Sequence, residues 1–134
     1  MIKKYKPYAP HALKALLWSS TVYQDTEDDN AEGLAADKFE PTTELAEFVD
    51  KQFETFEEMV QDAMPYFDPD NDYRKFGDAW EQMEHDFILT INNTGAGFWD
   101  GDWTHGEQLT AICKDFSPIE VYLFESKIYR YGAK

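Results

Sequence analysis

The feature that most constrains the fold is an amphipathic stretch between two prolines, Pro41 and Pro65. Its apolar residues recur at every third or fourth position: Leu45, Phe48, Val49, Phe53, Phe56, Met59, Val60 and Ala63. This spacing places them on one face of an α-helix. Thr42 or Thr43 is the expected N-cap, and Pro65 is expected to end the helix. The stretch therefore predicts one long helix at 43–64 with an apolar stripe packed on a core.

Acidic side chains recur along the same helix, mostly away from the apolar stripe: Glu44, Glu47, Asp50, Glu54, Glu57, Glu58 and Asp62. Because an α-helix rises about 1.5 Å per residue, this stripe repeats a negative charge about every 5 Å. B-DNA carries one phosphate per about 3.4 Å along each strand, which is a comparable density. We therefore predict that these seven residues form a partner-binding surface.

The charge of the chain is concentrated in one segment. Residues 24–72 hold 17 Asp and Glu against Lys38 and Lys51, which accounts for the whole net charge of −15. Such a field repels nucleic acid and anionic membranes and attracts basic partners. We expect a basic protein as partner, with no direct nucleic-acid or membrane contact; the sequence leaves the oligomeric state open.

Size and composition predict one globular domain over residues 1–134. The chain has 134 residues, of which 43% are hydrophobic and 16% aromatic, enough for a core without covalent staples. Cys113 is the only cysteine, which excludes an intramolecular disulfide and favours a reducing compartment. Lys14 interrupts the apolar stretch near the start, so a secretory signal is not expected. We predict a cytoplasmic protein of the host cell.

The other segments predict a mixture of helices and strands. Further helices are expected at 9–20, at 73–86 with Phe76, Trp80, Met83 and Phe87 facing inward, and at 107–116; residues 24–40 read as a loop with a short helical piece. Strands are expected at 87–91, 97–99, 121–124 and 127–131, with the last turn at Glu125-Ser126. The predicted class is α+β, with N-terminal acidic helices packed on a small antiparallel sheet of ββαββ order.

Metal-binding patterns are incomplete. Asp68, Asp70 and Asp72 match the opening of a calcium loop, but its sixth position is Tyr73 and its twelfth is Ala79. A solvated acidic turn is the alternative. Asp100, Asp102 and His105 could form a loose cation site, and zinc would need His85, His105 and Cys113 without standard spacing. We predict no metal site.

Catalytic patterns are equally incomplete. Cys113 lies on the apolar face of its predicted helix, which favours packing over reactivity. Ser19 and Ser20 lack the context of a nucleophile elbow, and Gly95-Ala-Gly97 is too short to be a phosphate-binding loop. The sequence therefore predicts a protein that is not an enzyme and has no cofactor.

Residues 85–100 read HDFILTINNTGAGFWD, and GEQLT follows at 106–110. This pattern resembles a family of small uncharacterised proteins of tailed bacteriophages and related mobile elements, whose motif is HDFxLTRNGHGAGFWD followed by GxxLT. The tripeptide at Trp18 echoes the same family. The chain departs from the motif at Ile91, Asn93 and Thr94, where the family has Arg, Gly and His. The resemblance implies a phage-type origin and carries no mechanism with it.

Two roles are open for the motif. The glycines permit close backbone approach, so Phe98, Trp99 and Trp103 could simply pack around a hairpin. Alternatively, Trp99 and Trp103 form an aromatic recognition patch and belong to the partner-binding residues. The leading functional hypothesis is an inhibitor of a host nucleic-acid-handling protein, such as a CRISPR effector or restriction enzyme, that presents a DNA-like negative surface. The alternatives are an acidic interaction module that uses the Gly-Ala-Gly-Phe-Trp segment, or a small cation-dependent enzyme.

Overall fold

The computed structural model describes residues 8–23 and 33–132. The four longest helices are α1 (Pro10–Ser19), α2 (Thr43–Ala63), α4 (Ala79–Ile91) and α5 (Gly106–Cys113). α3 (Pro69–Asp72) is a single turn, and 3₁₀ turns occupy Ala36–Lys38 (η1) and Phe98–Asp100 (η2). The class is α+β, as predicted. Residues 24–32 of the predicted loop lie outside the described residues.

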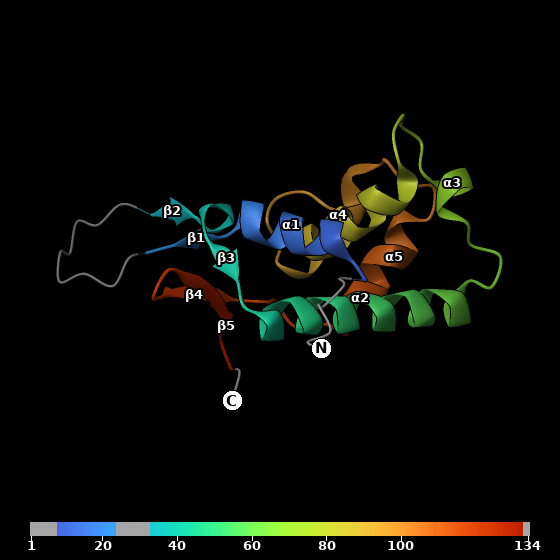
Figure 1. Cartoon of the computed structure of the whole chain (residues 1–134). Helices are drawn as coiled ribbons and strands as arrows, with labels where there is room; N and C mark the ends of the chain where they lie inside the picture. The colour runs from blue at the N-terminus through green and yellow to red at the C-terminus, as the bar shows by residue number, and fades with distance from the viewer. Residues whose placement is uncertain (1–7, 24–32, 133–134) are drawn as a thin grey trace, which may run out of the picture.

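Two small sheets lie together at one end of the molecule (Figure 1). β1 (Thr21–Val22) pairs antiparallel with β2 (Leu34–Ala35). In the second sheet, β5 (Lys127–Arg130) lies between β3 (Glu40–Pro41), to which it is parallel, and β4 (Val121–Phe124), to which it is antiparallel. The predicted hairpin at 121–131 is therefore confirmed, with Glu125 and Ser126 at positive φ in its turn.

The long helix between the two prolines begins and ends where the sequence predicted. The hydroxyl of Thr42 caps it by accepting a 3.2 Å hydrogen bond from the Leu45 amide. It ends at Ala63, just before Pro65. The predicted helices at 9–20 and 107–116 are also present, as α1 and α5.

The predicted helix at 73–86 is confirmed only from residue 79 onward, and the two strands predicted after it are wrong. α4 begins only at Ala79, capped by Asp78, because Gly77 has a φ of +122° that a helix cannot contain. Phe76 and Trp80, predicted to face inward, are exposed. The predicted strand at 87–91 is the second half of α4, and the predicted strand at 97–99 is instead the N-cap and the first two residues of η2. The ββαββ order therefore does not occur.

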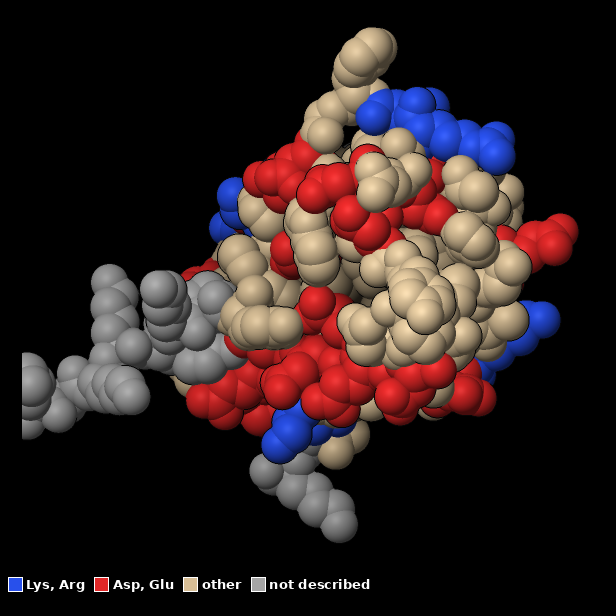
Figure 2. All heavy atoms as spheres, turned by 90° about the vertical axis from the view of Figure 1, so that its right-hand side faces the viewer, with Lys and Arg blue, Asp and Glu red and all other residues tan. Residues whose placement is uncertain are grey.

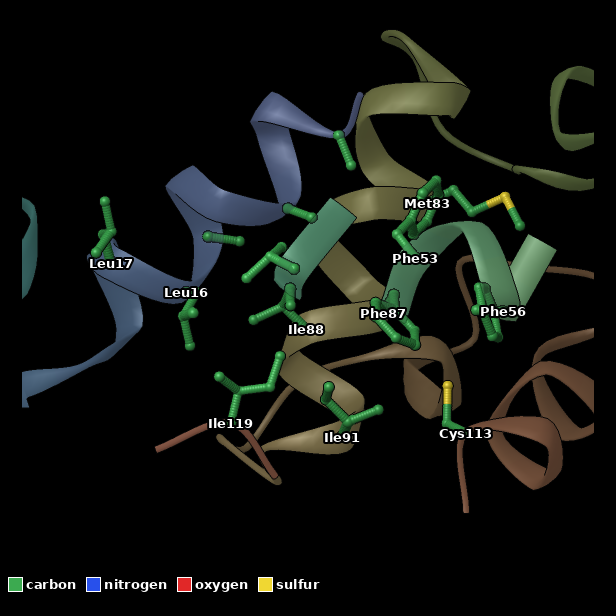
Figure 3. Packing of buried hydrophobic residues seen from close by; sticks show 14 of the residues in the cluster. Leu16, Leu17, Phe53, Phe56, Met83, Phe87, Ile88, Ile91, Cys113 and Ile119 are labelled. Atoms are coloured by element: carbon green, nitrogen blue, oxygen red, sulfur yellow. The ribbon is translucent and has the colours of Figure 1, made fainter. Parts of the chain in front are cut away.

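The core lies among the helices, so the predicted packing of helices on a sheet is also wrong. Helical spacing puts Met83, Phe87, Ile88 and Ile91 of α4 inside, facing α1 and α2. The ring of Phe87 lies 4.7 Å from that of Phe56 and 5.7 Å from that of Phe53 (Figure 3). The sheets contribute only a few side chains, such as Val22 and Ile128. No helix within residues 8–23 and 33–132 combines the length and apolarity that a membrane crossing needs.

Candidate functional site

Four of the seven predicted acidic residues form an exposed row along α2: Glu47, Glu54, Glu58 and Asp62. In the described part of the chain, none of these four carboxylates has a Lys, Arg or His partner within ion-pair distance. Lys51 is exposed between Glu47 and Glu54. Acidic side chains gather across the lower part of the face in Figure 2, where the C-terminal end of α2 points to the viewer.

The other three acidic residues of α2 have partners inside the protein. Glu44 accepts two hydrogen bonds from Arg130, at 3.1 and 2.7 Å, and that guanidinium also lies 3.9 Å from the centre of the Phe48 ring. Glu57 accepts a 2.6 Å hydrogen bond from the hydroxyl of Tyr8, which raises the pKa of Tyr8 to about 12. Arg130 therefore neutralises Glu44, and Tyr8 occupies one carboxylate oxygen of Glu57.

Asp50 does not belong to the exposed surface at all. It is only 8% exposed and accepts a 2.7 Å hydrogen bond from the amide of Ala9. Its position on α2 follows the core residue Val49, so it lies at the edge of the apolar stripe. The prediction that Asp50 faces a partner is therefore wrong.

Asp50 and Glu84 together hold the N-terminus of α1. The residue at the N-cap position is Ala9, which has no side chain that could accept from the free amides. Oε1 of buried Glu84 accepts from the amides of His11, at 3.0 Å, and Ala12, at 3.1 Å. Desolvation by burial raises the pKa of Glu84, against the lowering effect of these amides. The sequence signal for this arrangement is the absence of a capping residue before Pro10.

The motif at 85–110 builds the interior. Thr90 Oγ1 donates to the carbonyl of Asp86, at 2.6 Å, and accepts from the amide of Phe98, at 3.0 Å. Gly97 has a φ of +152°, and a Cβ there would lie 2.3 Å from Thr90 Oγ1. The ring of Phe98 is fully buried and stacks on Phe56 at 5.6 Å. These contacts favour the structural role for most of the motif.

The two tryptophans predicted as partner-binding residues have different environments. Trp103 is 3% exposed, and its indole Nε1 donates a 2.8 Å hydrogen bond to buried Asp86. It cannot reach a partner, so this part of the prediction is wrong. Trp99 is 44% exposed and borders a hollow of about 410 Å³ together with Asn93 and Lys114. Of the pair, Trp99 alone is available for recognition.

The candidate cation sites do not come together. Asp72 is buried. Its carboxylate contacts ring Nδ1 of His105 and accepts a 3.0 Å hydrogen bond from the backbone amide of His105. Asp102 pairs with Lys75 at 3.2 Å, and Asp100 accepts from the amide of Gly97 at 3.3 Å. Within the described residues there is no group of three or more His, Cys, Asp or Glu that could hold a metal ion.

Cys113 is buried on the inner face of α5, and burial raises the pKa of its thiol. This environment stabilises the neutral thiol, as the packing interpretation expects.

A hollow of about 470 Å³ lies between α1 and the first turns of α4. The sequence analysis did not predict it, because segments far apart in the chain form its walls.

Comparison of the chain with protein-family models, with curated proteins and with solved structures finds no match.

Proposed function

We propose that the protein inhibits a basic, nucleic-acid-handling protein of the host cell by placing the exposed acidic row of α2 in the groove meant for DNA or RNA. One observation carries the proposal: Glu47, Glu54, Glu58 and Asp62 stand in a row on one solvent-facing side of a single helix, without cationic partners in the described part of the chain. Within the described residues no Lys, Arg or His lies at ion-pair distance from these four carboxylates, so a basic partner could pair with them.

The rigidity of α2 supports this proposal. Its opposite side carries Leu45, Val49, Phe53, Phe56 and Val60, all buried in the core. The row from Glu47 to Asp62 therefore keeps its spacing, over a length of about 22 Å at the rise of an α-helix. A line of charges that is already ordered loses little entropy on binding.

The row is shorter and less dense than the sequence predicted. Its last three members repeat a negative charge about every 6 Å, which is roughly half the phosphate density of one DNA strand. Lys51 also reduces the charge near its start. The segment 24–32, outside the described residues, carries five further acidic side chains. The proposal rests on the four carboxylates of α2 alone.

A competition experiment tests the proposal. Host lysate is loaded on immobilised duplex DNA, and the purified protein is added at low and at high salt. We expect it to release particular DNA-binding proteins at low salt, with an effect that falls steeply as salt screens the charges. The charge-reversal variant Glu47→Lys/Glu54→Lys/Glu58→Lys should release none of them.

A matched control separates the α2 row from net charge. The variant Glu107→Lys/Asp115→Lys/Glu120→Lys changes the same number of exposed acidic residues outside α2. It should release the same proteins as the unchanged chain. If both triple variants behave alike, or if neither differs from the unchanged chain, the α2 surface is not the inhibitory element.

The second candidate is an interaction module that uses Trp99. The observation in its favour is the exposure of this indole beside a hollow, while the nearby rings of Phe98 and Trp103 are buried. In that case Trp99→Ala should abolish binding to the partner, and salt should have little effect. The phage-type origin and the cytoplasmic location remain predictions.

A further inference from the structure

A second surface of the protein combines exposed aromatic rings with carboxylates. The hollow of about 470 Å³ lies between one face of α1, with His11, Lys14 and Trp18, and the beginning of α4. The segment that leads into α4 closes it with Tyr73 and Phe76. This surface is distinct from the acidic row of α2, and the inference below does not depend on the proposed function.

The aromatic walls are open to solvent. Trp18 is 63% exposed and Phe76 is fully exposed, whereas most other large apolar side chains of the helices are buried. The ring of Trp18 lies beside that of His85, with the ring centres 5.9 Å apart and a tilt of 36°. Exposed aromatic rings around a concave surface are typical of binding sites.

Carboxylates at the rim determine which ligand such a hollow can take. Asp78 and Glu81 both line it. The carboxylate of Asp78 is fixed, because it caps α4 by accepting from the amides of Trp80 and Glu81, at 3.0 and 3.2 Å. Glu81 lies 3.2 Å from Nε2 of His11 and is half-exposed, so it retains an oxygen for a ligand. Carboxylate and phosphate ligands are repelled by this pair.

Lys14 is the one Lys or Arg of the lining, and its side chain is exposed. It balances only one of the two carboxylates. The faces of aromatic rings attract cations, and a guanidinium can stack on a ring while its N–H groups bind a carboxylate in the same plane. Arginine fits this combination better than lysine, whose ammonium is a compact, strongly hydrated charge.

We propose that this hollow binds an arginine side chain of a partner protein, stacked on Trp18 and hydrogen-bonded to Glu81. Arginine is among the residues that contribute most at protein interfaces. The hollow would then supply a specific anchor, whereas the acidic row of α2 attracts basic surfaces in general.

Amide–proton correlation spectra of the ¹⁵N-labelled full chain test the proposal. The probe is N-acetyl-arginine amide, and N-acetyl-citrulline amide is its neutral control of nearly the same shape. We expect the arginine probe to shift and saturate the indole N–H signal of Trp18 and the amides of 78–85. The lysine analogue should bind more weakly, and citrulline should cause no saturable shift.

Variants locate the binding. Trp18→Ala and Glu81→Gln change exposed side chains, so both should fold. Each should weaken binding of the arginine probe by about two- to fivefold, as expected for one exposed cation–π contact at Trp18 and one exposed ion pair at Glu81. Glu47→Gln on α2 is the matched control and should leave the affinity unchanged. Equal shifts with citrulline, an unchanged affinity in the Trp18 variant, or a loss in the Glu47 variant would overturn the inference. None of these outcomes bears on the DNA competition assigned to α2.

Discussion

The indole Nε1 of Trp103 donates a 2.8 Å hydrogen bond to Oδ2 of Asp86, and both side chains are buried. The other carboxylate oxygen of Asp86 accepts a 2.8 Å hydrogen bond from the side-chain amide of Gln82. The pair ties the segment before α5 to the middle of α4. A buried carboxylate is stable only where donors replace its water, so this contact is part of the fold and not of a recognition surface.

Removal of this donor should destabilise the protein. Trp103→Phe keeps a ring in the core but leaves Oδ2 of Asp86 without its donor, for which we expect a loss of about 1–3 kcal/mol in the free energy of unfolding. Urea denaturation followed by circular dichroism measures it. Trp99→Phe is the matched control, and because Trp99 is exposed its effect should stay within about 0.5 kcal/mol. Equal losses in both variants would contradict this assignment.

Gly97 provides a second test of the motif. Gly97→Ala would place a Cβ 2.3 Å from Thr90 Oγ1, in a backbone conformation that is nearly restricted to glycine. Gly95 also has a positive φ, of +87°, but has nothing within 4 Å of its Cβ position. We expect Gly95→Ala to cost about 1–2 kcal/mol from the backbone alone and Gly97→Ala to cost more. Thermal unfolding of the two variants provides the comparison, and the reverse order would show that the contact with Thr90 is not close.

Glu84 should make stability depend on pH. Burial raises its pKa above the ordinary value of 4.5, so the folded state binds this proton more tightly than the unfolded chain does. The stability gained from the neutral carboxyl is fully present below pH 4.5 and is lost as pH rises through the raised pKa. Glu84→Gln keeps an acceptor for the amides of α1 but does not ionise.

The stability of Glu84→Gln relative to the unchanged chain should therefore increase as pH rises above about 4.5. Urea denaturation at several pH values measures the difference. Glu107→Gln, at an exposed position of α5, serves as the control and should show no such trend. A difference that is constant with pH would mean that Glu84 ionises as it does in the unfolded chain.

The sequence predicted the elements whose signals are local. α2 has a capping threonine, an apolar stripe and a proline beyond its end, and the hairpin of β4 and β5 has its turn at Glu125-Ser126. α4 was misplaced because Phe87-Ile-Leu-Thr-Ile91 has strand propensity. The contacts of Met83, Phe87, Ile88 and Ile91 with the rest of the core override that propensity, and their spacing is helical. Gly77, whose positive φ prevents an earlier start of α4, lies inside the helix that the sequence predicted at 73–86.

The candidate site shows the same difference between features with a local sequence signal and features that depend on long-range contacts. The period of the acidic residues on α2 was correct, but periodicity alone does not separate Asp50 from its exposed neighbours. Its partner is the amide of Ala9, 41 residues away in sequence. The burial of Trp103 depends in the same way on Asp86. Such long-range pairs leave no local signal, so the predicted surface contained residues that hold the fold.

Two acidic residues on the same helix provide the last prediction. Asp50 accepts from the Ala9 amide in the interior, whereas Glu47, one turn earlier, is exposed. Asp50→Ala leaves that amide buried without a partner and should lower the free energy of unfolding by about 1–3 kcal/mol. Glu47→Ala should change it by no more than about 0.5 kcal/mol.

The release of host proteins from DNA should respond in the opposite sense. Asp50→Ala removes a carboxylate that no partner can reach, so competition under conditions where the variant is folded should stay as it is in the unchanged chain. Glu47→Ala removes a member of the exposed row and should weaken competition, most clearly at low salt, where its charge is least screened. If all the acidic residues of α2 had one function, Asp50→Ala and Glu47→Ala would change stability and competition in the same way. Opposite patterns in the two measurements would separate the acidic residues that stabilise α1 from those available to a partner.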